Sequence, residues 1–118
     1  NTSIQDGAVI HTTAFTPTKV GNNVTVGHLA HLEGCIVHDW ALVGSGSIVL
    51  HNAIIHEHAR VGAAAMVPGG VEVPRCAMAL GVPAKIREDA VEEFHARMNV
   101  DAYVQRGAQF REALRRLD

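Results

Sequence analysis

An unbroken six-residue period is the sequence feature that most constrains how this chain can fold. β-Branched residues recur at every sixth position across residues 37–73: Val37, Val43, Val49, Ile55, Val61, Val67 and Val73. A small residue stands two positions before most of them: Cys35, Ala41, Ser47, Ala53, Ala59 and Ala65. A helix would scatter residues spaced by six around its axis, whereas short strands separated by bends place them all on the inside. The period therefore predicts an all-β protein, a parallel β-helix of hexapeptide repeats, in preference to a sandwich of short strands.

The size and charge of the chain fit one domain and exclude several classes of partner. With 118 residues it is large enough to bury a core, and its formal charge of −2 suggests neither nucleic acid nor an anionic membrane as a partner. No apolar segment reaches the length of a membrane span, and no signal peptide opens the sequence. Cys35, one of two cysteines, occupies the small inward position of a repeat, which favours a reducing, cytoplasmic setting.

Near its N-terminus the repeat is interrupted twice. Ile10 and Val20 are ten residues apart rather than six, which predicts a loop over residues 12–19. The step from Leu32 to Val37 is five residues. The first residues are already in phase, so we expect that N-terminal coils are absent from this sequence.

The composition changes after the last repeats. Pro74 is expected to end strand pairing, and the β-helix is expected to occupy residues 1–86. Residues 87–118 are rich in Ala, Glu, Arg and Leu at helical spacing, which predicts a C-terminal α-helix packed on the β-helix. The apolar surface for this helix, or for a subunit interface, would come from outward positions: Leu42, Ile48, Ile54 and Met66.

Histidine is unusually frequent, with 8 in the chain. We expect His38, His51, His56, His58 and His95 to be solvated or hydrogen-bonded side chains. His11 and Glu33 each follow an inward residue, so they should point outward at equivalent positions one coil apart. His31 should lean to the same side as Glu33, and His28 should lie at a neighbouring corner. These four potential ligands, gathered along one outer edge, suit zinc, which accepts imidazole nitrogen and carboxylate oxygen.

The same residues resemble a known family. The segments Asn1-Thr2-Ser3-Ile4-Gln5-Asp6-Gly7-Ala8-Val9-Ile10-His11, Thr25-Val26-Gly27-His28, Gly34-Cys35 and Gly81-Val82-Pro83-Ala84-Lys85-Ile86-Arg87 closely resemble the γ-class carbonic anhydrases and their bacterial relatives. The Gln-Asp…His element followed by Val-Gly-His is specific, whereas Gly-x-Pro-Ala-Lys also occurs in hexapeptide acyltransferases.

The resemblance implies a left-handed β-helix, a homotrimer, and a metal held between adjacent subunits by three histidines. Two of these correspond to His11 and His28, and the third would stand five residues after His28. The implied metal is zinc, or Fe²⁺ or Co²⁺ in its place, and the implied reaction is reversible hydration of CO2 to bicarbonate. Gln5 and Asp6 match the polar pair beside the metal, and Tyr103 resembles an aromatic residue that the C-terminal helix sends toward the site.

One departure from the family pattern bears directly on activity. Glu33 stands where the family has its third histidine, so either Glu33 or His31 would serve as the third ligand. A carboxylate cancels one unit of metal charge and should leave the bound water less acidic, which slows CO2 hydration at neutral pH. The alternatives are an inactive trimeric scaffold or binding protein on the same fold and, less favoured, a hexapeptide acyltransferase.

Overall fold

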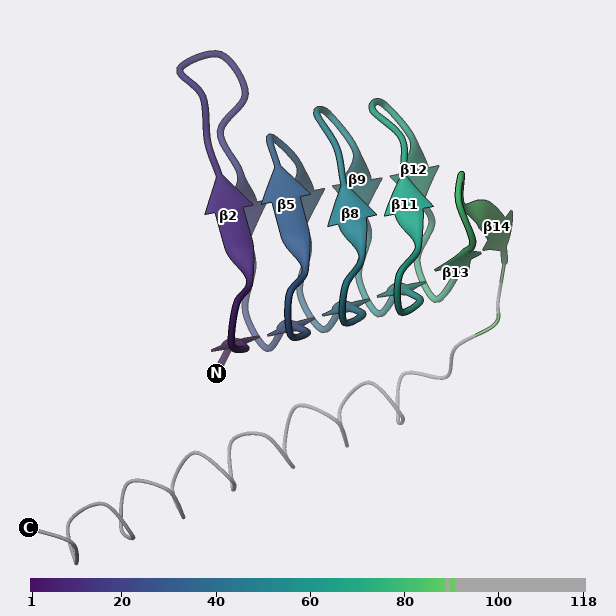
Figure 1. Ribbon diagram of the computed structural model, residues 1–118. Coiled ribbons are helices and arrows are strands. Elements are labelled where there is room, and N and C mark those ends of the chain that lie inside the picture. Colours follow the sequence, from purple (N-terminus) through teal and green to yellow (C-terminus); the bar gives the residue numbers. More distant parts are fainter. Residues whose placement is uncertain (89, 91–118) are drawn as a thin grey trace, which may run out of the picture.

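Short strands stack into a three-faced solenoid in the computed structural model, which describes residues 1–88 and 90 (Figure 1). Face A holds six strands: β1 (Ser3–Ile4), β4 (Thr25–Val26), β7 (Leu42–Val43), β10 (Arg60–Val61), β13 (Met78–Leu80) and β14 (Lys85–Arg87). Face B holds four: β2 (Val9–His11), β5 (His31–Glu33), β8 (Ile48–Val49) and β11 (Met66–Val67). Face C holds four: β3 (Lys19–Val20), β6 (Ile36–Val37), β9 (Ile54–Ile55) and β12 (Glu72–Val73).

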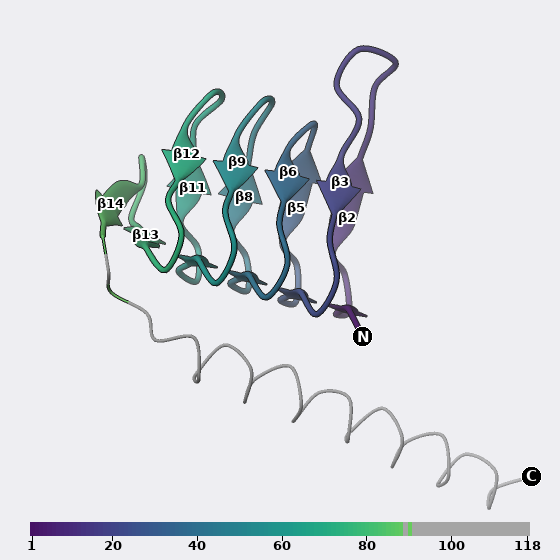
Figure 2. The same ribbon diagram turned by 180° about the vertical axis from the view of Figure 1, so that it is seen from behind.

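Successive coils pair in parallel and in a constant register. Val43 pairs with Val61 on face A, and Ile55 pairs with Val73 on face C, so one coil takes 18 residues, or three hexapeptides. The chain rises along β2, crosses at a loop and descends along β3 on the far side before it advances to the next coil (Figures 1 and 2). This winding is left-handed, as the resemblance implies.

The predicted inward positions form the core. Each of the seven β-branched residues from Val37 to Val73 is at most 1% exposed, and so are the six small residues that precede them. Stacking at a constant register brings each Val or Ile against its counterparts in the coils before and after, which fills the narrow interior. The interpretation of the six-residue period as a parallel β-helix, and the all-β fold class, are therefore confirmed.

The corners use a backbone conformation that the sequence did not indicate. Asn52, His58 and Ala64 have φ values of 64°, 60° and 58°, in the left-handed region, and each precedes a small inward residue. Residues with side chains rarely adopt this conformation outside turns. Because the position accepts residue types as different as Trp40 and Cys76, composition alone could not identify it.

The first coil differs from those that follow it. Ile4 and Ile10 pair in register with Val26 and Leu32, so they occupy inward positions as predicted. They are nevertheless 45% and 43% exposed, because β1 and β2 are edge strands whose outer side no described coil covers. The predicted loop is present and spans residues 12–18, since Lys19 already belongs to β3.

The C-terminal end of the solenoid corrects one prediction. Strand pairing continues past Pro74, because β13 pairs in parallel with β10, and β14 then returns antiparallel to β13. Pro74 is tolerated because it follows β12, the edge strand of face C, where none of the described strands needs its missing N–H. Most of the predicted helical segment, with Tyr103 and His95, lies outside the described residues; of its first residues Arg87 belongs to β14, and neither residue 88 nor residue 90 is assigned to a helix.

The outward apolar residues do not form one surface. Leu42 lies on face A, Ile48 and Met66 on face B, and Ile54 on face C, all less buried than their inward neighbours.

Cys35 fills its core position as predicted, and burial raises the pKa of its thiol from 9.0 to about 11. Within residues 1–88 and 90 there is no helix with the length and hydrophobicity needed to cross a bilayer.

Candidate metal site

His11 and Glu33 lie side by side on neighbouring strands. His11 ends β2, Glu33 ends β5, and the two residues are register partners. The preceding residues, Ile10 and Leu32, point inward, so the imidazole and the carboxylate both point outward at the same corner, between faces B and C. This is the arrangement that the repeat phase predicted, and strand spacing sets the two backbones about 5 Å apart.

His31 contributes a second imidazole to this corner. It lies two residues before Glu33 on β5, so both side chains project from the outer side of the strand. His31 Nε2 is 4.0 Å from Glu33 Oε2. Two ligand atoms on one tetrahedral zinc lie about 3.3 Å apart, so a small rotation of either side chain would let both reach the same ion.

His28 lies at the opposite edge of face B. It sits in the turn before β5, whereas Glu33 is the last residue of β5, so the whole strand separates them. Three extended residues span about 10 Å, so the side chains of His28 and Glu33 leave the backbone at opposite ends of the strand. The expectation that all four ligands gather at one edge of a single chain is therefore wrong. Accordingly, the described part of one chain contains no group of three or more His, Cys, Asp or Glu that could hold a metal.

Gln5 and Asp6 belong to the same edge as His28. β1 pairs with β4 so that Ile4 meets Val26, which carries the turn after β1 onto the turn that contains His28. Two hydrogen bonds fix this stacking, from the Gln5 N–H to the Val26 carbonyl at 2.9 Å and from the Leu29 N–H to the Asp6 carbonyl at 3.0 Å. The side-chain nitrogen of Gln5 is buried and has no hydrogen-bond partner among the described residues. The candidate residues of one chain thus fall into two groups, or candidate half-sites, one at each edge of face B.

A threonine that the sequence analysis did not single out ties down the His11 edge. Thr18 Oγ1 donates to the His11 carbonyl at 2.5 Å and accepts from the Gly34 N–H at 2.8 Å. It therefore links the backbone at His11 to the residue next to Glu33. Thr2 makes a similar bridge at another corner, donating to the Gly21 carbonyl at 2.7 Å and accepting from the Val24 N–H at 3.3 Å.

Of the other described histidines, His38 and His51 are exposed and His56 is hydrogen-bonded, as predicted, whereas His58 is only 7% exposed. His56 Nε2 lies 2.8 Å from Glu72 Oε1, and its ring stacks on His38 with centroids 5.5 Å apart. His58 stacks on Trp40 at 6.1 Å. These contacts run along the corner after face C, away from both edges of face B.

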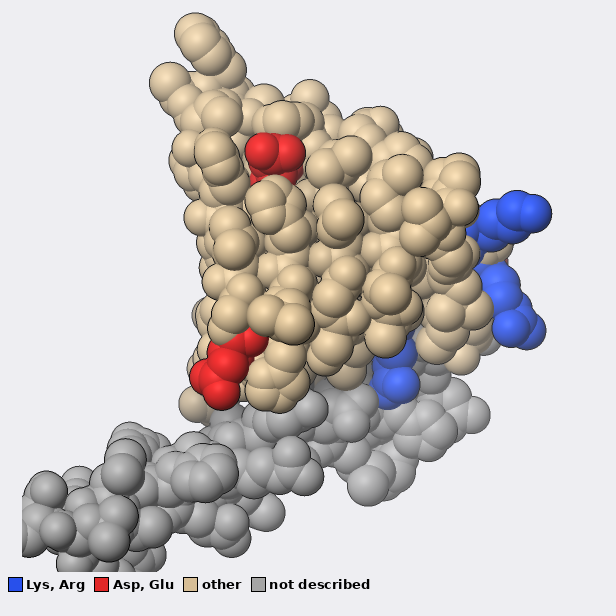
Figure 3. Space-filling view, viewed as in Figure 1, with Lys and Arg blue, Asp and Glu red and all other residues tan. Residues whose placement is uncertain are grey.

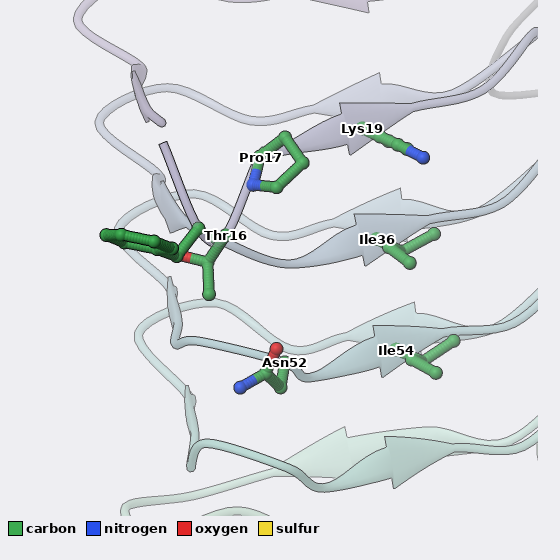
Figure 4. Close-up of a pocket in the computed structure, with 8 residues that line it drawn as sticks. Thr16, Pro17, Lys19, Ile36, Asn52 and Ile54 are labelled. Carbon is green, nitrogen blue, oxygen red and sulfur yellow. The ribbon is translucent and has the colours of Figure 1, made fainter. Parts of the chain in front are cut away.

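A hollow of about 290 Å³ lies on face C beside the loop (Figure 4). Its floor is formed by Ile36 and Ile54, and its walls include Pro17, Lys19 and Asn52. Phe15, at the loop tip, also borders it and is 95% exposed. None of the predicted site residues within the described part of the chain lines this hollow.

Face B carries few charged side chains (Figure 3). Its outward positions from the N-terminal to the C-terminal coil are Val9, His31, Ile48 and Met66, of which Val9 and Ile48 are 48% and 40% exposed. A mostly apolar, partly exposed column flanked by two polar edges is typical of a protein interface.

Comparison with known proteins shows which families this chain resembles. The chain matches no protein-family model. It is 36% identical to gamma carbonic anhydrase 2, mitochondrial, of Arabidopsis thaliana over 98 residues, which are 78% of this chain and 35% of the relative. It is also 36% identical to the carnitine operon protein CaiE of Escherichia coli over 103 residues, 86% of this chain and 53% of CaiE. The chain thus spans about half the length of these curated relatives, or less.

Solved structures share the fold. A Bacillus cereus protein named as a candidate acetyltransferase superposes with a TM-score of 0.75 at 27% identity, covering 95% of this chain and 78% of that one. A hexapeptide transferase family protein from Anaplasma phagocytophilum has a TM-score of 0.68 at 24% identity, covers 91% of this chain and 68% of that one, and shows the fold alone.

The solenoid and these matches define the class: the chain belongs to the hexapeptide-repeat proteins that fold as left-handed β-helices. Within that class its sequence is similar to gamma carbonic anhydrases and to CaiE, which confirms the resemblance carried by Gln5-Asp6, His11 and Val26-Gly27-His28.

Proposed function

We propose that this protein is a metal-dependent enzyme that hydrates CO2 reversibly to bicarbonate, at sites shared between adjacent subunits of a homotrimer. The observation that carries the proposal is the division of the candidate residues between the two edges of face B. His11 and Glu33 occupy one edge and His28 the other, with Gln5 and Asp6 beside it. Neither half can close a metal site within one chain, but the two are complementary.

A ring of three copies would bring the halves together. If the threefold axis runs parallel to the solenoid and face B turns toward it, the His11 edge of each copy meets the His28 edge of the next. Such a contact is heterologous, and it closes on itself after three subunits. The apolar outward residues of face B, such as Val9 and Ile48, would then be buried near the axis, which gives the ring a hydrophobic driving force.

The donor set suits zinc, and ferrous iron or cobalt would be chemically acceptable in its place. His11 and Glu33 are adjacent, the partner's edge supplies His28, and His31 lies 4.0 Å from Glu33 as an alternative third ligand. When bound in such a site, a divalent metal supplies a nucleophile for CO2 by lowering the pKa of water to about 7. A carboxylate ligand reduces this effect, so Glu33 would keep activity at neutral pH below that of a three-histidine site.

The remaining residues of the half-sites would orient the reactants. The buried Gln5 amide nitrogen has an unused donor at the His28 edge, which is where an oxygen of CO2 or of the attacking water would accept a hydrogen bond. Asp6, whose carbonyl accepts from the Leu29 N–H, would fix the turn that presents His28. Tyr103 is proposed, from the resemblance alone, to approach the site from the C-terminal segment.

Two other functions have specific support. The replacement of a ligand histidine by Glu33 favours a trimeric scaffold or binding protein that has lost turnover. The structural similarity to a Bacillus cereus protein named as a candidate acetyltransferase supports acyl transfer, although the paired half-sites at His11 and His28 have no role in that reading.

Metal analysis of the purified protein combined with a CO2-hydration assay tests the proposal. We expect one divalent metal per interface, lost in both His11→Ala and His28→Ala. Glu33→His should raise the hydration rate at pH 7 about tenfold, because a neutral ligand leaves more charge on the metal. Comparison of Glu33→Ala with His31→Ala identifies the third ligand, since only the ligand's removal should release metal. Metal content unchanged in His11→Ala and His28→Ala would exclude the site.

A further inference from the structure

Two large hydrophobic side chains lie beside the two half-sites and are mostly exposed instead of packed against their own chain. Phe15 is 95% exposed and Leu29 is 70% exposed, more than any other large apolar side chain in the described residues; Val82 at 69% is next. Phe15 belongs to the loop that follows His11, and Leu29 directly follows His28. Val82 lies at the far end of the solenoid, in the turn between β13 and β14.

The loop holds Phe15 outward instead of letting it fold back. Thr13 Oγ1 accepts from the Thr16 N–H at 3.0 Å and lies 2.6 Å from Thr16 Oγ1, which closes the turn around Phe15. The apolar hollow on face C lies next to the loop, yet Phe15 only borders it and leaves nearly all of its ring in solvent. A ring fixed in this way loses little conformational freedom when a partner covers it.

Leu29 is out of place for its corner. The equivalent positions in the neighbouring coils are Gly7, Gly46 and Ala64, and all four residues have a positive φ. Leu29 has φ 61°, a conformation that favours glycine, and it is the only large apolar residue among these four. The corner therefore holds a bulky apolar side chain in a backbone conformation that suits it poorly, at an edge where it is mostly exposed.

We infer that Phe15 of one subunit packs against Leu29 of the next and covers one side of the shared metal site. The inference rests on the proposed function, because the ring that joins the His11 edge to the His28 edge also joins the loop to the Leu29 corner. The occupant of both exposed surfaces is a second copy of this chain. Each apolar contact excludes water from the rim of the site, as the residues around an interface hot spot do.

Cross-linking between two single-cysteine variants tests the contact. Phe15→Cys and Leu29→Cys are made separately in a Cys76→Ser background, which leaves only the buried Cys35. The two proteins are mixed, allowed to exchange subunits and treated with a short bis-maleimide. We expect a covalent dimer on a denaturing gel from the mixture and none from either variant alone. Phe15→Cys mixed with Val82→Cys is the matched control and should give no dimer.

A second measurement does not depend on the reagent. Phe15→Ser and Leu29→Ser should each weaken trimer association about tenfold or more in sedimentation equilibrium, whereas Val82→Ser should not. Trimers that form normally, with no Phe15–Leu29 cross-link and no effect of either serine variant, would overturn this inference and leave the proposed function intact. A wild-type chain that remains a monomer would overturn both.

Discussion

The regular coils and the first coil share one repeat pattern but differ in what surrounds them. Inward residues such as Val49 and Ile55 are fully buried, because a coil lies on either side of each. Ile4 and Ile10 occupy the same inward positions in the first coil and are 45% and 43% exposed. In a solenoid, therefore, burial depends on having neighbours on both sides rather than on the local sequence.

The two regions also differ in what they carry. Between Val37 and Val73 the repeat has neither loop nor slip, and it supplies the core. The first two coils contain the loop over residues 12–18, the five-residue step after Leu32 and every described candidate site residue. Departures from a repeat commonly mark the places where function takes precedence over stability.

The largest expected effect is a difference in the free energy of unfolding when isoleucine is replaced by alanine in each of the two regions. Ile55→Ala should lower the free energy of unfolding by about 3–5 kcal/mol, since it removes three carbons from a closed core. Ile10→Ala should cost about 1 kcal/mol, because its side chain is already 43% exposed and leaves no cavity. Urea denaturation of the two variants measures the difference. Equal losses would mean that the first coil is covered as completely as the interior.

A smaller, pH-dependent effect is expected at Cys35, where the two regions meet. Burial raises the pKa of this thiol to about 11 in the folded chain, against 9.0 in the unfolded chain. Its contribution to stability is therefore fully present below pH 9 and is lost as the pH rises toward 11, by about 2–3 kcal/mol.

Cys35→Ala is the matched variant for this effect, because alanine fills the same position at Ala41 and Ala53. Its free energy of unfolding should lack this alkaline decline, and thermal denaturation of both proteins from pH 8 to pH 11 measures it. A wild-type profile that runs parallel to that of Cys35→Ala would contradict the raised pKa.

The smallest expected effect on stability concerns two threonine hydroxyls that bridge coils, one at the His11 edge and one at another corner. Thr18→Val and Thr2→Val each remove a hydroxyl that bridges two coils, and each should cost about 1 kcal/mol. Only Thr18→Val should also weaken metal binding, because Thr18 links the backbone of His11 to Gly34. Thr18→Ser should restore the affinity. Calorimetric titration with zinc measures it, and equal affinity in the two valine variants would deny Thr18 a positioning role.

The regular coils could be predicted from the sequence more fully than the parts of the chain that depart from the repeat. The six-residue period predicts the core because a β-branched residue at each inward position leaves no competing arrangement, and it places His11 beside Glu33 once the loop is set aside. The antiparallel strand β14 was missed because its residues, Lys85–Arg87, no longer follow the inward pattern. The positive φ of the corner residues was not predicted because their residue types vary.

The position of His28 shows why site geometry was harder to predict than the core. The sequence indicates that His28 lies at a corner, but it does not indicate that the whole of β5 lies between that corner and Glu33. Only the assignment of strands to three faces separates the His28 edge from the His11 edge, and this separation is the reason that we propose a site between chains.

Subunit complementation tests the shared site most directly. His11→Ala and His28→Ala chains, carrying different tags, are purified alone and as mixed trimers from co-expression, and the metal content of each is measured. Neither variant alone should hold metal. In every mixed trimer an intact His11 edge meets an intact His28 edge at one of the three interfaces, so metal should return to about a third of the wild-type level. Mixed trimers as free of metal as their parents, or a single variant that keeps its metal, would contradict a site built from the two edges of face B.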